Sequence, residues 1–476
     1  MTWLLRSLAI SLVAGLSACS LTPARVRPEA PVPAVFPMSA TAPASPPVAD
    51  IGWRTLFPDP RLQRLIGLAL ANNRDLRLAA LNVQAAQAQH GIQRAAQQPG
   101  IEATGGGTHQ RTAPTGKAAS AQPAELTQQF SASIGLSAFE LDLFGRARSL
   151  SDAAFARYLA TEEGRVAAHI ALVGAVADAY LAERLAMAQH ALATRTLQDW
   201  QRSLELTRRL WQAQQSSGLD VAQADGQVAT AEADLEVRTR TLAQAQNALR
   251  MRVGTELPDD LPEGWPLDRQ PVLTALPAGL PSDLLTRRPD IRQAEQQLAA
   301  AQADIGAARA AFFPRISLTA ALGFASPALS GLFDSQSRGW SFSPQITQPL
   351  FQGGRLRAEL RLAEVRQSSA VAEYERSVQT AFREVADGLA AQPTYGRQVA
   401  AQARAVDSAE RRAHLSQLRY RAGLEGRLEL LDAQRQLYAA QQSLLDLRRE
   451  AFGSTVALYK ALGGGVLEHT ATPSTP

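Results

Sequence analysis

Two acidic side chains near the C-terminus have a spacing that suits cation binding. Glu429 and Asp432 are three positions apart, so they lie on one face if this segment is helical. Repeated by symmetry in an oligomer, the pair forms rings of carboxylates that attract cations. Arg435 is placed to pair with Asp432 one turn away. The alternative is that both acids only solvate an exposed helix face.

The residues that enzymes and metal sites use most often are scattered along the chain. The six histidines (His90, His109, His169, His190, His414 and His469) show no ligand spacing, and Cys19 is the only cysteine. There is no G-x-S-x-G sequence, and Gly116-Lys117 lacks the neighbours of a phosphate-binding loop. We therefore expect no enzymatic activity, no metal and no cofactor, and energy for any transport has to come from a partner.

The composition argues against binding to nucleic acid. The 476 residues are 46% hydrophobic and 19% charged, and 48 basic against 44 acidic residues leave a formal net charge of +4. Lys117 and Lys460 are the only lysines, so nearly all of the basic residues are arginines. A chain of this length and polarity can bury a large core or form two to three domains with a mixed-charge surface.

The N-terminus predicts export and lipid attachment. Residues 1–18 combine Arg6, a short apolar run and small residues, which is typical of a signal peptide and too short for a transmembrane helix. Residues 16–19, LSAC, resemble the lipobox of bacterial lipoproteins, which implies that Cys19 is acylated; Ser20 then favours the outer membrane. An ordinary signal peptide with an incidental cysteine is the alternative. Residues 19–60 are expected to be an extended tether.

The chain contains an internal duplication. Gly145-Arg146 recurs as Gly354-Arg355, and Gly254 recurs as Gly463, both 209 positions later and without a gap between them. Upstream of the first anchor the offset becomes 215. We assign the repeats to residues 61–254 and 283–463. A Pro-rich linker at 255–282 joins them, and a tail at 464–476 follows.

Two short strands are expected in each repeat. Apolar and small polar residues alternate near 128–143, 315–326 and 339–350, and a weaker, Gly-rich partner lies near 101–111. Ten or so residues is the length that a tilted membrane-spanning strand needs. The alternative is a soluble hairpin packed on a core. Finding two hairpins at equivalent places favours the membrane interpretation.

Long helices are expected after each pair of strands. Residues 146–211 and 355–420 contain few helix breakers, and a second helical segment follows each of them, at 219–252 and 428–461. Helices of this length have to pack along their sides against other helices.

The membrane interpretation requires oligomerisation. Four spanning strands cannot close a barrel, and hydrocarbon does not tolerate an open sheet edge. Two chains would give eight strands around a filled interior, whereas three would give twelve strands and room for a channel. The small Ser, Thr, Gly and Ala residues on the second face of the strands fit a wet lumen.

A family resemblance agrees with this interpretation. Residues 287–295 read RRPDIRQAE and residues 305–314 read IGAARAAFFP, which resembles the signature of outer-membrane efflux proteins of the TolC superfamily. With the lipobox, the chain most resembles the NodT/OprM-like lipoprotein branch of resistance-nodulation-division (RND) efflux systems. The fold class implied is mainly α with a membrane β-barrel, built from a duplicated helix–strand–strand–long helix–helix unit. Three chains would share a twelve-stranded β-barrel that continues into a periplasmic α-barrel.

The resemblance also implies partners and site residues. The helical tips would meet a periplasmic adaptor bound to an inner-membrane RND transporter. Leu428, Glu429, Asp432 and Arg435 lie in a run that resembles the pore-constricting segment of the family. Asp220 and Tyr420 match the positions of a link between hairpins that helps to hold the tip closed. Gln214 stands where the second repeat has Gly423, which leaves the shape of the first turn open.

The favoured function is a passive, gated exit duct for drugs or other small molecules. The outer-membrane component of a type I protein-secretion system shares this fold and is the alternative, although the lipobox and residues 287–295 favour the efflux branch. A lipid-anchored periplasmic coiled-coil tether or adaptor is the alternative of a different class, but it has no use for spanning strands.

Overall fold

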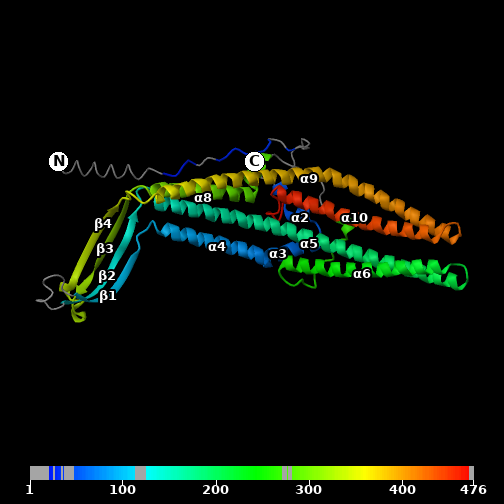
Figure 1. The fold of residues 1–476 in the computed structure, drawn as a ribbon, viewed down its shortest axis with the longest axis horizontal. Helices are drawn as coiled ribbons and strands as arrows, with labels where there is room; N and C mark the ends of the chain where they lie inside the picture. Colours follow the sequence, from blue (N-terminus) through cyan, green and yellow to red (C-terminus); the bar gives the residue numbers. More distant parts are fainter. Residues whose placement is uncertain are drawn as a thin grey trace. The chain divides into compact units, whose positions relative to one another are not determined.

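Figure 1 shows the computed structural model of the chain. The structure describes residues 21–24, 27–33, 36, 48–112, 125–270, 276 and 281–470. Cys19 and the whole of residues 1–18 lie outside the described residues, so lipid attachment stays a prediction.

Helices and strands follow the same order twice. In the first repeat α4 (Arg74–Ala95) leads into β1 (Ile101–Thr112), β2 (Glu125–Leu141), α5 (Arg146–Gln212) and α6 (Gly218–Val253). In the second, α8 (Pro289–Ala310) leads into β3 (Arg315–Ser326), β4 (Arg338–Thr347), α9 (Arg355–Arg421) and α10 (Arg427–Ala461). Two further helices, α3 (Pro60–Asn72) and α7 (Pro281–Arg287), lie at the start of the two repeats. The short helix α2 (Trp53–Leu56) precedes the first repeat, so the segment expected to be an extended tether is helical there. The predicted helix–strand–strand–long helix–helix unit is confirmed in both copies.

The long helices α5 and α9 have 67 residues each and are rich in residues with high helix propensity. Equivalent positions in the two repeats are buried alike: Val176 and Val385 are both 0% exposed. Among the described residues, α5 holds the one helical window long and apolar enough to cross a membrane, and half of that window is buried within the protein. Packing within the chain therefore accounts for part of the apolar composition of α5.

Contacts divide the chain into two compact units, and each unit takes segments from both repeats. The first unit comprises Met1–Pro28, Val83–Thr161 and Ala294–Tyr374, and it contains all four strands. The second comprises Glu29–Asn82, Glu162–Gln293 and Glu375–Pro476, and it contains α6, α10 and the greater part of α5 and α9. The duplicated segments therefore fold side by side within each unit and do not form one unit per repeat.

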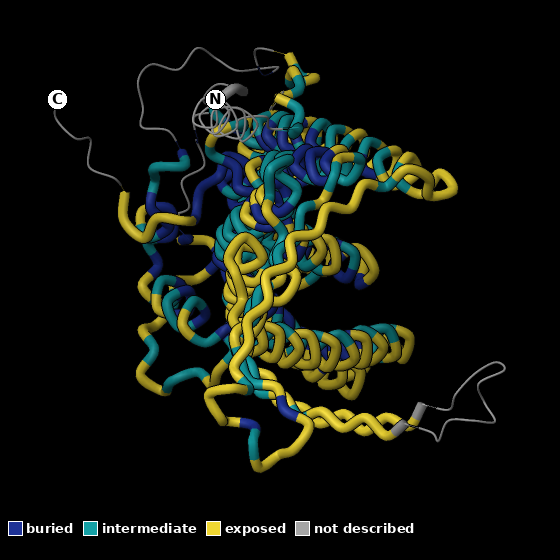
Figure 2. Tube along the Cα trace, turned by 90° about the vertical axis from the view of Figure 1, so that its left-hand side faces the viewer, coloured by how far each residue is buried: buried dark blue, intermediate teal, exposed yellow. Residues whose placement is uncertain are grey.

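The strands of the first unit form one antiparallel sheet in the order β1-β2-β3-β4. Residues directly opposite one another lie on the same face. Ile134 pairs with Ala103 and Leu322, and Leu322 pairs with Trp340, so one face carries a row of apolar side chains across all four strands. These side chains are exposed: the exposed fraction is 60% for Ile134, 50% for Leu322 and 79% for Trp340. All residues of β4 are exposed, whereas β2 and β3 mix exposed and intermediate residues, which are yellow and teal in Figure 2.

A β-bulge in β2 corrects one sequence expectation. The alternation predicts that Ala138 shares the apolar face with Leu136, but the register shifts between Leu136, which pairs with Ala320, and Phe139, which pairs with Leu318. Ser137 and Ala138 of β2 thus lie opposite one residue of β3, Thr319, and Ala138 adopts a left-handed backbone with φ of 47°. Phe139 takes the apolar position in its place.

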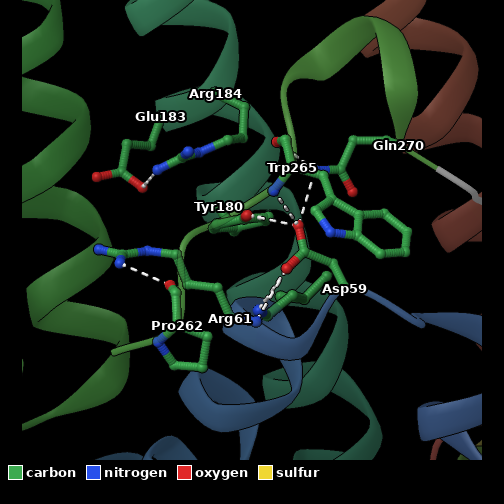
Figure 3. Close-up of polar contacts among 9 residues, drawn as sticks. Asp59, Arg61, Tyr180, Glu183, Arg184, Pro262, Trp265 and Gln270 are labelled. Carbon is green, nitrogen blue, oxygen red and sulfur yellow. Dashed lines mark hydrogen bonds and ion pairs between the residues drawn. The ribbon is translucent and has the colours of Figure 1, made fainter. Parts of the chain in front are cut away.

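A buried carboxylate fixes the linker between the repeats inside the second unit (Figure 3). Asp59 is 1% exposed, and its Oδ1 accepts the backbone N–H of Arg61 at 2.9 Å, which caps α3. The other oxygen, Oδ2, accepts the Tyr180 hydroxyl at 2.7 Å, the Gln270 amide at 2.9 Å and the backbone N–H of Trp265 at 3.0 Å. Burial is the main reason why the pKa of Tyr180 is raised.

The RRPD motif, residues 287–290, connects the start of α8 with α9 and with the end of α10. Arg288 is 7% exposed; it forms a bidentate pair with Asp290 and donates to Glu384 at 2.8 Å and to the Ala461 carbonyl at 3.0 Å. Asn73, the equivalent residue of the first repeat, donates to the Arg252 carbonyl at 2.8 Å. Asn73 therefore binds the last turn of α6, and Arg288 binds the last turn of α10. In the second repeat Arg288 also forms an ion-pair cluster with Asp290 and Glu384.

Candidate functional site at the hairpin turns

The second unit contains two helical hairpins that end in short turns. We define hairpin 1 as residues 162–212 of α5 with α6, and hairpin 2 as residues 375–421 of α9 with α10. The two turns have the same backbone design: the N–H of Gln215 donates to the Leu210 carbonyl at 2.8 Å, and the N–H of Leu424 donates to the Arg419 carbonyl at 2.9 Å. This bond across five residues is typical of a Schellman motif.

A left-handed residue completes each turn. Gly423 has φ of 72°, and Gln214, its counterpart in the first repeat, has φ of 60°. The question that Gln214 raised at the sequence level is thereby answered, since the first turn keeps the shape of the second without a glycine. A non-glycine residue in this region is strained, so the backbone bonds of the turn have to hold it.

Asp220 and Glu429 occupy the same position of their respective hairpins, 209 residues apart. In hairpin 1, Ser217 and Asp220 form a reciprocal capping box at the start of α6. The backbone N–H and the hydroxyl of Ser217 both donate to the Asp220 carboxylate, which lowers the pKa of Asp220 below its usual value. In hairpin 2 the N-cap is Gly426, which has no side chain to complete a box around Glu429.

Asp432 pairs across hairpin 2 and not along α10. Its carboxylate lies 2.8 Å from the Arg412 guanidinium of α9 and also accepts the amide of Gln436 at 3.0 Å. The sequence expectation that Arg435 pairs with Asp432 is therefore not met, because Arg412 occupies that carboxylate. Arg435 instead lines a cavity beside Leu428, whose side chain is 64% exposed.

The expected link residues Asp220 and Tyr420 do not bond to each other among the described residues of this single chain. Arg427 lies close to both of them. Its guanidinium carbon is 5.4 Å from the centre of the Tyr420 ring, and its charge contributes to the lowered pKa of Asp220. Arg427 also donates to the Ser203 hydroxyl of α5 at 3.0 Å, although it is only 5% exposed. Whether Asp220 and Tyr420 link in an assembly stays a prediction.

Sequence reasoning missed Arg427 and a second set of contacts between the hairpins. The Tyr438 hydroxyl of α10 donates to the Asp234 carboxylate of α6, and Gln189 of α5 donates to Asp446 of α10 at 2.7 Å. Arg238 connects the two bonds, since it pairs with Asp234 at 3.3 Å and donates to Gln189 at 3.0 Å. Burial, followed by the bond to Asp234, raises the pKa of Tyr438 to about 12.

An antiparallel sheet with an exposed apolar face, combined with two long helical hairpins, defines the class as a subunit of a membrane channel. The family model "Outer membrane efflux protein" matches residues 65–255 and 280–464. The chain therefore belongs to the outer membrane efflux protein family, and the resemblance seen in the sequence is confirmed.

Relatives and solved structures agree with this assignment. The chain is 46% identical over 474 residues to the toluene efflux pump outer membrane protein TtgC of Pseudomonas putida, covering 99% of this chain and 97% of that protein. It is 42% identical to the outer membrane protein OprJ of Pseudomonas aeruginosa, covering 96% and 95%. Its structure matches the open state of the MtrE outer membrane channel of Neisseria gonorrhoeae with a TM-score of 0.85 and 38% identity, covering 95% and 100%. The chain is thus an outer-membrane efflux channel protein.

Proposed function

We propose that three copies of this chain form the exit duct of a tripartite efflux pump. The observation that carries the proposal is the pair of sheet edges: β1 and β4 each pair on one side only among the described residues. An open edge is not tolerated in hydrocarbon, so β1 of one copy has to pair with β4 of the next. Three copies then close twelve strands, which is wide enough for a channel.

The two faces of the sheet support this arrangement. The apolar row through Ile134, Leu322 and Trp340 is exposed in the single chain and suits lipid. The opposite face carries small polar side chains, and Thr104 pairs there with Ser133, while Thr319 pairs with Ser343. Such a face suits a water-filled lumen. We further propose that acylated Cys19 anchors the chain in the same membrane.

The hairpin turns are the proposed docking site for a periplasmic adaptor. Leu219 and Leu428, which are equivalent residues of the two repeats, are 66% and 64% exposed, and Leu424 is 70% exposed. Exposed apolar side chains at two similar turns suit contact with a partner. An inner-membrane RND transporter bound to that adaptor would supply the energy.

The proposed cargo is small, hydrophobic or amphipathic molecules. Relatives are named as outer membrane proteins of a toluene efflux pump and of an antibiotic efflux pump. In this chain Leu428, Glu429, Asp432 and Arg435, with the link residues Asp220 and Tyr420, are proposed to control opening at the periplasmic end. A protein-secretion component has the same architecture, but the named relatives favour a pump.

Purification of the full-length protein in a neutral detergent tests the assembly. Light scattering should give roughly three times the chain mass of 51.0 kDa, and the same sample should form channels in planar bilayers. Expression in a strain that lacks its own efflux channel should lower accumulation of a hydrophobic dye. A stable dimer would contradict the proposal, since eight strands leave no room for a lumen.

A further inference from the structure

A cavity of about 680 Å³ lies between hairpin 1 and α10, entirely within the second unit. Its apolar wall is formed by Trp200 of α5, Ala231 of α6 and Leu431 of α10, which are 8%, 7% and 6% exposed. A cavity of this size accommodates one small organic molecule.

Gln227 and Arg435 line the cavity and have polar atoms without partners among the described residues. The Nε2 of Gln227 is buried and forms no hydrogen bond in the structure. Arg435, which is exposed at the cavity, forms no ion pair or hydrogen bond with any residue that the structure describes. The Nε2 of Gln227 and the guanidinium of Arg435 can only donate hydrogen bonds, so a ligand has to supply an acceptor to each. The positive charge of the guanidinium favours a negatively charged acceptor.

The carboxylate that lines the cavity is already engaged. Asp234 accepts the Tyr438 hydroxyl and pairs with Arg238 at 3.3 Å. Its negative charge is therefore compensated, which leaves Arg435 as the charge without a partner at this cavity. The Tyr438 ring packs on the Trp200 indole with a centroid distance of 6.3 Å, so the aromatic wall is held in place.

We infer that this cavity binds a small amphipathic anion. An aromatic or short aliphatic body packs against Trp200, Ala231 and Leu431, and a carboxylate or sulfonate head accepts hydrogen bonds from Arg435 and Gln227. Such a ligand contacts α5, α6 and α10 together, so it stabilises the arrangement of the two hairpins seen here relative to any other.

The consequence for gating rests on the proposed function. Leu428 and Arg435 line the cavity and also belong to the predicted gate. An occupant of the cavity is therefore expected to shift the channel between conducting states. Binding and conductance are separate measurements, so the site and its effect on the gate can fail independently.

Calorimetry with naphthalene-2-sulfonate and the purified full-length protein in a neutral maltoside detergent tests the site. The wild type should bind the probe saturably. Arg435→Gln should weaken binding about tenfold, as expected when one charge-assisted hydrogen bond is lost, and Arg435→Lys should weaken it less. Ala231→Phe should abolish binding by filling the cavity.

The control is Arg421→Gln, because Arg421 is exposed at the end of α9 and does not line the cavity. It should bind the sulfonate like the wild type, and uncharged naphthalene should bind wild type and Arg435→Gln equally. The site is overturned if the wild type shows no saturable binding, or if Arg435→Gln, an exposed substitution that leaves the core intact, binds as tightly as the wild type. Saturable binding that leaves single-channel conductance unchanged overturns the link to the gate and leaves the proposed duct untouched.

Discussion

At the residue scale, Asp220 contributes to α6 through its capping box, and this contribution depends on pH. Asp220→Asn removes the negative charge of the carboxylate that accepts the Ser217 N–H. The first turn of α6 should therefore lose about 1 kcal/mol of stability, and its amide hydrogens should exchange about fivefold faster. The folded-state pKa is lowered, so the contribution is complete above the ordinary pKa of 3.8 and is lost as the pH falls through the lower folded value.

Hydrogen exchange measured by mass spectrometry at pH 6 and below pH 3 checks this prediction after correction for the intrinsic rates. The exchange rates of the wild type and of Asp220→Asn in the first turn of α6 should differ at pH 6 and become equal in acid. Glu429→Gln is the matched control. The N-cap of α10 is Gly426, which forms no capping box with Glu429, so this substitution should change the exchange rates less. An equal effect of both substitutions would show that helix-dipole interaction, and not the capping box, is responsible.

The sequence allowed the residues at the turns to be predicted, but not their partners. Spacing of three identifies Glu429 and Asp432 as neighbours on a helix, because that relation is local. Arg412, which pairs with Asp432, is 20 positions away, and Asp234 is 204 positions from Tyr438. No periodicity encodes such contacts, since they depend on how two hairpins pack against each other.

At the element scale, the strands were predictable because a period of two survives in β2, β3 and β4. The bulge in β2 could not be predicted, because one extra residue leaves the alternation of apolar and polar residues intact on either side of it. The face of Phe139 is therefore set by its pairing with Leu318, which only the three-dimensional register reveals. The turn around Gln214 shows the opposite case, in which a changed residue keeps the conformation of its repeat partner.

The apolar face of the sheet is expected to contact lipid, so a charge on it should hinder assembly. Leu322→Arg places a guanidinium on that face, at a cost of roughly 2–4 kcal/mol if the position lies near the bilayer midplane. Ser343→Arg is the matched control on the opposite face; Ser343 pairs with Thr319 and is exposed. Thr319 is less suitable, because its hydroxyl accepts the Ala138 N–H at the bulge.

The yield of heat-resistant trimer on semi-native gels measures this difference. Leu322→Arg should reduce the yield, whereas Ser343→Arg should leave it close to that of the wild type. Equal losses from the two faces would mean that this face of the sheet packs on protein and not on lipid.

At the scale of the whole molecule, the two compact units do not coincide with the two sequence repeats. One unit gathers the four strands from both repeats, and the other gathers both hairpins. A duplicated chain thus contributes two similar turns to the same end of one unit, and the turns differ in charge: Asp432 of the second repeat corresponds to Gln223 of the first.

In a trimer, Glu429 and Asp432 provide six carboxylates around the axis, so Glu429→Gln combined with Asp432→Asn should weaken block of single-channel current by divalent cations. Arg412 already compensates part of the Asp432 charge at 2.8 Å, so Glu429→Gln alone should account for most of the effect. Arg412→Gln should strengthen cation block, because it leaves the Asp432 carboxylate without its partner.

The matched control is Asp225→Asn, since Asp225 pairs with Arg208 across hairpin 1 at 2.7 Å, much as Asp432 pairs with Arg412 across hairpin 2. Block curves for magnesium, recorded for all four variants in the same bilayer, separate a ring at the constriction from a general change in surface charge. If Asp225→Asn relieves block as strongly as the double variant, cations respond to the overall charge of the hairpins. If none of the variants changes block, Glu429 and Asp432 only solvate the surface of α10, and the channel narrows elsewhere.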